Sequence, residues 1–267
     1  MMTTGDILVI KFGGHAMSDN DGVFGKKLSS AIAQGLKVVV VHGGGPHINK
    51  ALEDAAIASA FVGGFRVTTP ETFAVVERVL SDEVGPAVAT TLTQSGVASL
   101  AISGRHSGTL FACKQTTLVD GTSADLGLVG EVKSVDPAAI YVLLEKGVTP
   151  VISPIANDVD SENGLNVNAD IAAAAVAGAV KAKELIIMTD VPGIYRNWPD
   201  KDSLIDAICA EELTSIKGKF AEGMAPKVQA CLDAIAAGAS AVRIIDGRDP
   251  EAFALALAHT GGTLVVA

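Results

Sequence analysis

Six short runs of apolar, largely β-branched residues recur along the 267-residue chain and constrain its fold more than any other feature. They cover residues 7–10, 38–41, 97–102, 148–152, 185–188 and 241–245. Because the runs are largely apolar and do not alternate between polar and apolar positions, we expect strands buried on both faces, as in a parallel sheet. Segments of helix length separate the runs, at residues 22–34, 46–56, 70–94, 136–146, 169–181, 224–237 and 250–258. This alternation predicts an α/β sandwich with right-handed crossovers.

Several segments depart from the alternation. Residues 110–132 and 157–167 combine Gly, Thr, Asp and Asn with short apolar pieces, which predicts hairpins that project from the sheet. Residues 193–204 are predicted to form an exposed loop. Residues 180–184 are the best candidate for a boundary between two parts of the chain. In the longest helical segment, Gly85-Pro86 is expected to kink or break the helix.

The composition excludes several classes of protein. Apolar residues make up 49% and charged residues 19%, which is a globular balance. A net charge of −10 and an aromatic content of 4% argue against a nucleic-acid partner, because such binding uses cationic and base-stacking side chains. Three widely spaced cysteines without a C-x-x-C pair indicate neither a disulfide framework nor a zinc site. The N-terminus has no basic and apolar leader, and no run reaches the ~20 residues of a membrane span, so we expect a cytoplasmic protein with no membrane partner.

Two glycine-rich segments follow the first two predicted strands. Lys11 precedes Gly13 and Gly14, where a lysine could hold a phosphate, although a tight turn with a solvated lysine explains the segment equally well. His42 leads into residues 43–46 (GGGP), where a helix that begins at proline leaves free N–H groups, which is typical of an anion site. We expect His42 to be a turn residue rather than a base. The segment matches neither a Walker A loop nor the G-x-G-x-x-G dinucleotide pattern.

Polar residues mark two further positions. Arg66 follows a Gly-Gly pair and could clamp a carboxylate, although a surface arginine is the simpler interpretation. Asn168 and Asp170 open the alanine-rich helix, and capping explains much of their presence, while Asp170 could also orient nearby lysines. Capping does not explain Asn166, which lies two residues earlier on the same side of an extended segment, so it is a candidate substrate ligand.

The last third of the chain holds two more candidates. Lys227 lies in the first turn of a predicted helix, where a cation opposes the helix dipole. A broken local rule often marks function, although a tolerated surface lysine is the alternative. Residues 188–195 (MTDVPGIY) could enclose a nucleotide, but turn chemistry also explains them. The chain has no H-E-x-x-H, no G-x-S-x-G and no Cys/His cluster, so metal-hydrolase and serine-hydrolase interpretations have little support.

Taken together and in this order, the motifs resemble those of the amino acid kinase family. The matching stretches are 11–14 (KFGG), 42–46 (HGGGP) with Ile48-Asn49, 65–68 (FRVT), 166–170 (NVNAD), 189–193 (TDVPG), Gly223-Met224 with Pro226-Lys227, and 261–263 (GGT). The resemblance implies an α/β fold, an open three-layer αβα sandwich around a mainly parallel sheet. It implies that residues 1–182 form an N-terminal lobe for acyl-acceptor binding and dimerisation, and that residues 183–267 form a C-terminal lobe for ATP.

The resemblance also implies an activity and a role for each candidate residue. The HGGGP-x-I-N stretch resembles the branch that phosphorylates the side-chain carboxylate of N-acetyl-L-glutamate with ATP, in the second step of arginine biosynthesis. Lys11 and Lys227 would stabilise the transferring phosphoryl group, and Asp170 would position both lysines. The substrate would be held by Gly44, Gly45, Arg66 and Asn166. ATP, with Mg²⁺ bound through its phosphates and not through protein ligands, would be held by Gly13, Gly14, Asp190, Val191, Pro192, Gly193, Ile194, Tyr195, Lys219, Phe220 and Ala221.

Some stretches depart from the family pattern, and other interpretations stay open. Residues 103–108 (SGRHSG) lack the acid of the family's S-G-x-D-G, Glu222 stands where glycine is common, and residues 81–86 depart from V-G-x-V-N. Arginine-inhibited relatives carry an extra N-terminal helix, whereas the first predicted strand begins at residue 7, so we expect an arginine-insensitive homodimer.

Three other functions stay open. The alternatives are a related kinase of aminoadipate or glutamate, a catalytically silent ligand sensor on the same fold and, more distantly, a Rossmann oxidoreductase.

Overall fold

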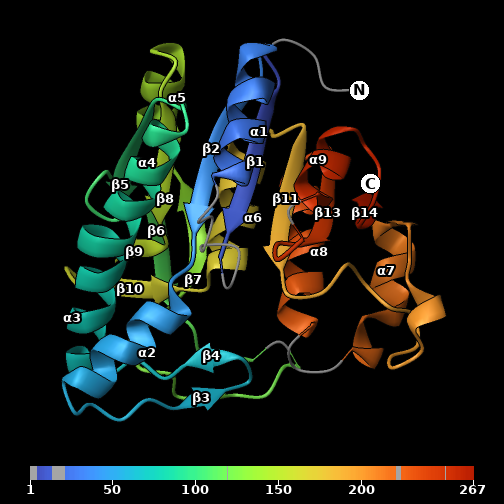
Figure 1. The fold of residues 1–267 in the computed structure, drawn as a ribbon. Coiled ribbons are helices and arrows are strands. Elements are labelled where there is room, and N and C mark those ends of the chain that lie inside the picture. The colour runs from blue at the N-terminus through green and yellow to red at the C-terminus, as the bar shows by residue number, and fades with distance from the viewer. Residues whose placement is uncertain (1–4, 14–21, 119, 221–223, 250) are drawn as a thin grey trace.

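One mainly parallel sheet forms the centre of the computed structural model, which describes residues 5–13, 22–118, 120–220, 224–249 and 251–267 (Figure 1). In spatial order the eight strands described are β12 (Ala207–Cys209), β14 (Thr263–Val266), β13 (Ala241–Asp246), β11 (Glu184–Thr189), β1 (Ile7–Phe12), β2 (Lys37–His42), β8 (Thr149–Ser153) and β5 (Ser99–Ser103). Neighbouring strands are parallel except for the antiparallel pair β13–β14. Each of the six predicted apolar runs overlaps a strand of this sheet, so the mainly parallel architecture is confirmed.

Helices cover both faces of the sheet because the strands are apolar on both faces. In β1, Val9 packs into one hydrophobic core, while Leu8 and Ile10 pack into a second core on the opposite face. The first core is completed by α5 (Ala138–Glu145), α6 (Ala169–Ala179), α7 (Ala210–Ile216) and α8 (Ala225–Ala236). The second is completed by α1 (Val23–Ala33), α2 (Gly45–Asp54), α3 (Pro70–Arg78), α4 (Gly85–Gln94) and α9 (Ala252–Leu257). The predicted three-layer αβα sandwich is therefore confirmed.

The two predicted hairpins form a small sheet of their own. β6 (Leu110–Lys114) pairs antiparallel with β7 (Val129–Val135), and β9 (Ile155–Asp158) pairs antiparallel with β10 (Gly164–Val167). Parallel pairing of β7 with β10 and of β6 with β9 closes the four strands into a barrel. A further short hairpin, β3 (Phe61–Val62) with β4 (Phe65–Arg66), lies with α2 at the bottom of Figure 1, the end toward which the β11 arrow points.

Three features differ from the sequence expectations. Residues 70–94 are not broken at Gly85-Pro86, because a π-helical segment (η2, Val79–Val84) joins α3 to α4 and places the wider turn just before Pro86, which has no N–H to donate. Strand β5 is not buried on both faces, because it lies at the edge of the sheet, where Leu100 is 49% exposed. The short elements β12, α7 and β14 carry too few residues to give a sequence pattern.

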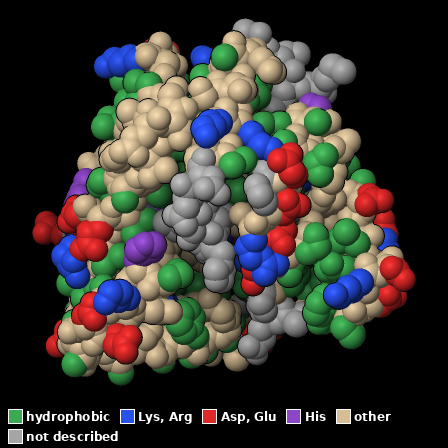
Figure 2. Space-filling view, viewed as in Figure 1, with side chains coloured by type: hydrophobic (Ala, Val, Ile, Leu, Met, Phe, Trp, Pro, Cys, Tyr) green, Lys and Arg blue, Asp and Glu red, His purple; other side chains and the backbone are tan. Residues whose placement is uncertain are grey.

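The loop at residues 193–204 is largely exposed, as expected, and contains a short 3-10 turn at Lys201–Ser203 (η3). A second 3-10 turn follows α7 at Lys217–Lys219 (η4). Within the described chain, no helix is both long and apolar enough to cross a membrane. On the face drawn in Figure 2, described Lys and Arg side chains are interspersed with Asp and Glu instead of forming one basic stripe.

Candidate active site

Two cavities lie beyond the carboxyl edge of the sheet, where ligands of open α/β proteins usually bind. The first, which we call the charged cavity, has a volume of about 400 Å³ and is lined by Lys11, Gly44, Gly45, Arg66, Asn166, Asp170 and Lys227 among others. The second, which we call the aromatic cavity, has a volume of about 740 Å³ and is lined by Asp190, Val191, Tyr195, Arg196, Asn197, Trp198, Lys219, Phe220, Met224 and Lys227. Lys227 lines both, so the two cavities meet at its side chain.

Asp170 is the buried centre of the charged cavity. The Asn168 side chain caps α6 by accepting from the Asp170 N–H at 2.8 Å, which confirms the predicted cap and fixes Asp170 in the first turn. Its Oδ2 accepts a hydrogen bond from Lys227 Nζ at 3.0 Å, and its Oδ1 lies 3.0 Å from Lys11 Nζ in an ion pair without hydrogen-bond alignment. Burial alone would raise the pKa of Asp170, but the two lysines outweigh it and lower the pKa to about 2. Asp170 is therefore an anion that holds both ammonium groups.

Gly43, Gly44 and Gly45 connect β2 to α2 and line the same cavity. Gly44 is the residue before the helix, with Pro46 in its first turn, so the leading N–H groups have no partner within the helix. A Cβ at Gly44 would lie 2.5 Å from Leu80 Cδ2, so a larger residue here would have to displace the Leu80 side chain of η2. The predicted arrangement of a helix N-terminus with available N–H groups is present and adjoins the two lysines.

Arg66 is buried rather than a surface arginine, contrary to the simpler interpretation. Its Nη2 donates to Asn49 Oδ1 at 2.6 Å, its Nη1 donates to Ser59 Oγ, and its guanidinium lies 4.6 Å from the centre of the Phe61 ring. Burial lowers the pKa of Arg66, and among the described residues no carboxylate forms an ion pair with it. A buried cation without an anionic partner is suited to a ligand carboxylate.

Asn166 also lies in the charged cavity, on β10. Its Nδ2 donates to Thr68 Oγ1 at 3.2 Å, and Thr68 Oγ1 donates to the Arg66 carbonyl at 2.8 Å. This chain of bonds joins two predicted ligands that are 100 positions apart in the sequence. Asn49 belongs to the HGGGP-x-I-N stretch, and the structure shows that it contacts Arg66, which the sequence pattern does not indicate.

Only some of the residues predicted to bind the nucleotide line the aromatic cavity. Asp190, Val191, Tyr195, Lys219 and Phe220 line it. Ile194 is instead buried and donates its N–H to Thr263 Oγ1 at 2.8 Å, Gly193 packs against the same threonine, and Pro192 does not line the cavity. Gly13 lies beside Lys11 and Gly43, where a Cβ would be 3.0 Å from Lys11 Nζ. Gly14 and Ala221 lie outside the described residues. The cavity is also lined by Arg196, Asn197 and Trp198, which belong to no motif, and by Met224, whose motif gave it no predicted role.

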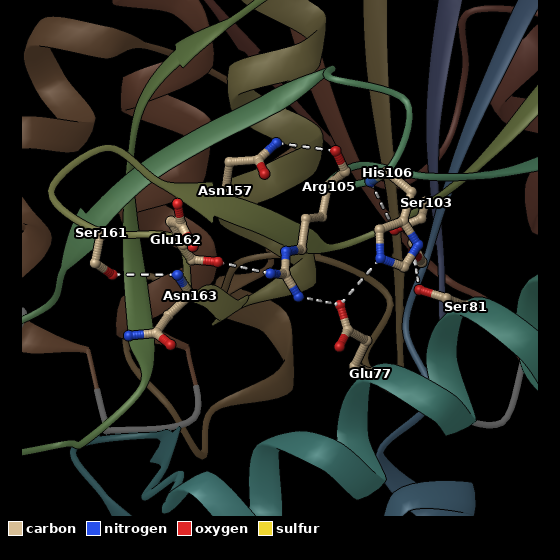
Figure 3. A network of polar contacts seen from close by, with 10 residues as sticks. Glu77, Ser81, Ser103, Arg105, His106, Asn157, Ser161, Glu162 and Asn163 are labelled. Atoms are coloured by element: carbon tan, nitrogen blue, oxygen red, sulfur yellow. Dashed lines mark hydrogen bonds and ion pairs between the residues drawn. The ribbon is translucent and has the colours of Figure 1, made fainter.

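The stretch that lacks the expected acid forms a polar network beside the small barrel (Figure 3). Arg105 Nη1 donates to Glu77 of α3 at 2.9 Å, and Arg105 Nη2 donates to the Glu162 carbonyl in the β9–β10 turn at 2.9 Å. Asn157 Nδ2 donates to the Arg105 carbonyl at 2.9 Å, and His106 Nε2 lies 3.6 Å from Glu77 Oε1. The network joins α3, which follows Arg66, to the hairpin that carries Asn166.

Chemically, the charged cavity can gather negative charge. Two lysines, an arginine and glycine N–H groups face a single carboxylate that is already paired twice. Within the described ranges, no three His, Cys, Asp or Glu side chains group as a metal site. Such preorganised donors stabilise charge that is shared during phosphoryl transfer. Together with an adjoining aromatic cavity on an open α/β sheet, they define a phosphotransferase.

Comparison with known proteins places the chain within that class. The model of the amino acid kinase family matches residues 6–246, and the chain belongs to this family. It is 45% identical to an acetylglutamate kinase of Paenarthrobacter aurescens (strain TC1), over 97% of this chain and 85% of the relative. It is 43% identical to an acetylglutamate kinase of Kineococcus radiotolerans (strain ATCC BAA-149 / DSM 14245 / SRS30216), over 98% of this chain and 91% of the relative.

The fold also resembles a solved structure at much lower identity. The N-acetylglutamate synthase from Neisseria gonorrhoeae, complexed with coenzyme A and N-acetyl-glutamate, matches with a TM-score of 0.83 at 21% identity. The match covers 99% of this chain and 60% of the synthase, so this chain corresponds to only part of that protein. At this identity the likeness establishes a shared fold.

Proposed function

We propose that this protein transfers the γ-phosphoryl group of ATP to the side-chain carboxylate of N-acetyl-L-glutamate, forming N-acetyl-L-glutamyl 5-phosphate in the second step of arginine biosynthesis. The observation that carries the proposal is the charge balance of the charged cavity. Lys11, Arg66 and Lys227 line it, while its one described carboxylate, Asp170, is held by the two lysines. A ligand with two carboxylates supplies the negative charge that this cavity lacks. The acetylglutamate kinases of high similarity point to the same substrate.

The same charge balance favours an N-acylated acid over a free amino acid. A free α-ammonium group would need an anionic partner, and the described lining offers no carboxylate besides Asp170. An acyl amide is neutral and can be bound by the amide of Asn166 and by apolar neighbours such as Phe65 and Leu80. Arg66 would bind the α-carboxylate in this arrangement.

The reaction requires no general base from the protein. A side-chain carboxylate is already ionised near pH 7 and can act as the nucleophile directly. The chemical difficulty is the approach of this anion to an anionic phosphate. Lys11, Lys227 and the N–H groups of Gly44 and Gly45 would stabilise the charge shared in the transition state, and Asp170 would hold the two ammonium groups in place.

We propose that ATP occupies the aromatic cavity. Tyr195, Trp198 and Phe220 can contact a base there, and Lys227 at the junction can reach phosphate oxygens. Mg²⁺ would enter on the phosphates and neutralise their charge, which suits a cavity whose carboxylate is already paired. In this proposal residues 1–182 bind the acceptor and residues 183–267 bind the nucleotide.

We also propose that the protein is a cytoplasmic homodimer. The open edge of β5 with its exposed Leu100 supports pairing with a second copy. The three cysteines are free, which suits a reducing compartment. Light scattering coupled to size-exclusion chromatography tests the assembly, and a monomeric mass would refute the dimer.

Trapping of the acyl phosphate with hydroxylamine tests the reaction. Purified protein receives Mg-ATP with N-acetyl-L-glutamate, glutamate, aspartate, aminoadipate or carbamate in parallel. We expect hydroxamate with N-acetyl-L-glutamate alone, and its loss in the Lys11→Ala variant. Hydroxamate from aminoadipate or glutamate would assign a different substrate, and no product from any acid would indicate a ligand sensor.

A further inference from the structure

His42 is a buried polar side chain that the proposed mechanism does not use. It ends β2 directly before the glycine loop and has no exposed surface. Its Nδ1 lies 2.8 Å from the carbonyl oxygen of Gly43. Its Nε2 has no hydrogen-bond partner among the described residues. Burial lowers the pKa of His42 to about 4, against the opposing effect of the Gly43 hydrogen bond, so the ring is neutral at physiological pH.

The tautomer of His42 follows from these contacts. A carbonyl oxygen can only accept, so the Nδ1–Gly43 contact requires the proton on Nδ1. A neutral imidazole carries one N–H, which leaves Nε2 as a bare acceptor. Nε2 faces the junction of η2 and α4, where a Cβ at Gly85 would lie 3.1 Å away. Among the described residues, the fold thus leaves one ring nitrogen without a partner, while the other contacts Gly43.

The contact with Gly43 determines where the next N–H group points. In a planar trans peptide, the carbonyl of Gly43 and the N–H of Gly44 point in opposite directions. Because the Gly43 oxygen is turned toward His42, the Gly44 N–H is turned away from it. On the side of η2, the Leu80 side chain occupies the space beside the α-carbon of Gly44. We infer that His42 is a positioning residue that holds the Gly43–Gly44 peptide with the Gly44 N–H directed into the charged cavity, at the transferring phosphoryl group. This inference rests on the proposed function.

Two neutral polar substitutions separate positioning from simple packing. In His42→Asn, the side-chain amide can donate from near the position of Nδ1. In His42→Gln, the side chain is closer in size to histidine, but its amide lies near the position of Nε2. A packing role predicts that glutamine is the better replacement, whereas the positioning role predicts that asparagine is.

We expect kcat of His42→Gln to fall about 100-fold, as for the loss of one preorganised N–H donor, and kcat of His42→Asn to stay within about 5-fold of wild type. KM for ATP should change little in both. Val40→Ala, on the same face of β2 and equally buried, should lower the melting temperature while kcat stays near wild type. If His42→Gln does not fold, His42→Leu takes its place.

Equal activity of the two variants, or higher activity of His42→Gln, would overturn the inference. A wild-type protein that forms no hydroxamate would instead refute the proposed function. A crystal structure of His42→Gln decides the inference independently of activity. A rotated Gly43–Gly44 peptide would support it, and an unchanged peptide would overturn it.

Discussion

The charged and aromatic cavities are built by opposite means. The charged cavity takes its key side chains from strands and helix starts, and Lys11, Arg66 and Asp170 are buried and held by ion pairs or hydrogen bonds. The aromatic cavity takes most of its lining from residues between elements, and Trp198 is 65% exposed. We infer that the charged cavity is preorganised, whereas the aromatic cavity is completed when a ligand binds.

The largest expected effect is at the two lysines. Lys11→Ala and Lys227→Ala should each lower kcat at least ~100-fold while the protein stays folded, because each removes one preorganised cation. Among the described residues only Lys227 lines both cavities, so of the two variants Lys227→Ala should also weaken binding of a non-hydrolysable ATP analogue. Steady-state kinetics and calorimetric titration measure the two effects.

The exposed Lys50, which pairs with Asp54, provides the control, and Lys50→Ala should behave as wild type. Activity near wild type in Lys11→Ala or Lys227→Ala would remove that lysine from the mechanism. Equal loss of nucleotide binding in both variants would remove the distinction between the cavities.

The sequence predicted the charged cavity better than the aromatic one, for a physical reason. Lys11 lies next to the last residue of β1, and Asp170 and Lys227 lie in the first turns of helices. Because the carboxyl ends of parallel strands meet at one edge, such local motifs converge there. The partners of Arg66 could not be predicted, because Asn49 and Ser59 reach it from separate segments. Trp198 lies in a loop whose conformation depends on contacts such as the pairing of Tyr195 with Leu204. The π-helical segment also depends on packing against His42 and Gly44, which no local pattern records.

The second largest effect is expected at Arg66. Arg66→Gln should raise KM for N-acetyl-L-glutamate about 30-fold, because charge-assisted hydrogen bonds to a carboxylate contribute about 1.5–3 kcal/mol. KM for ATP should change less than about 2-fold if the two cavities are independent. Arg66→Lys keeps the charge but loses the fork of donors, so its KM should be intermediate. A parallel rise in KM for both substrates would contradict independent cavities.

The pH dependence of stability tests whether Asp170 is ionised in the charged cavity. Its pKa is lowered from 3.8 to about 2 in the folded protein, so its ion pairs stabilise the fold above pH 3.8. This stability, about 2 kcal/mol, should be lost as the pH falls toward 2. The difference in free energy of unfolding between wild type and Asp170→Asn should therefore be constant from pH 5 to 8 and shrink below pH 4. Urea titrations across this range measure it, and a difference that changes between pH 5 and 8 would contradict a lowered pKa.

A smaller effect is expected at the network that joins α3 to the β9–β10 hairpin. Arg105→Ala should lower the free energy of unfolding by about 1–2 kcal/mol, because it leaves the partly buried Glu77 without its arginine. Arg78→Ala removes an ion pair with Glu83 that is half exposed, and should change stability by less than about 0.5 kcal/mol. Equal effects of the two substitutions would mean that the Arg105–Glu77 pair stabilises the fold no more than an exposed ion pair does.

The smallest effect is a spectroscopic one, and it tests the aromatic cavity directly. Trp198 is the single tryptophan of the chain and its side chain is largely exposed, so its emission should resemble that of an indole in water. Binding of ATP beside Trp198 should shift the emission to shorter wavelength, because a bound base displaces water from the ring. N-acetyl-L-glutamate alone should leave the spectrum unchanged, since Trp198 does not line the charged cavity. A shift caused by the acid alone would mean that filling the charged cavity rearranges the aromatic one, and the contrast between a preorganised and a ligand-completed site would fail.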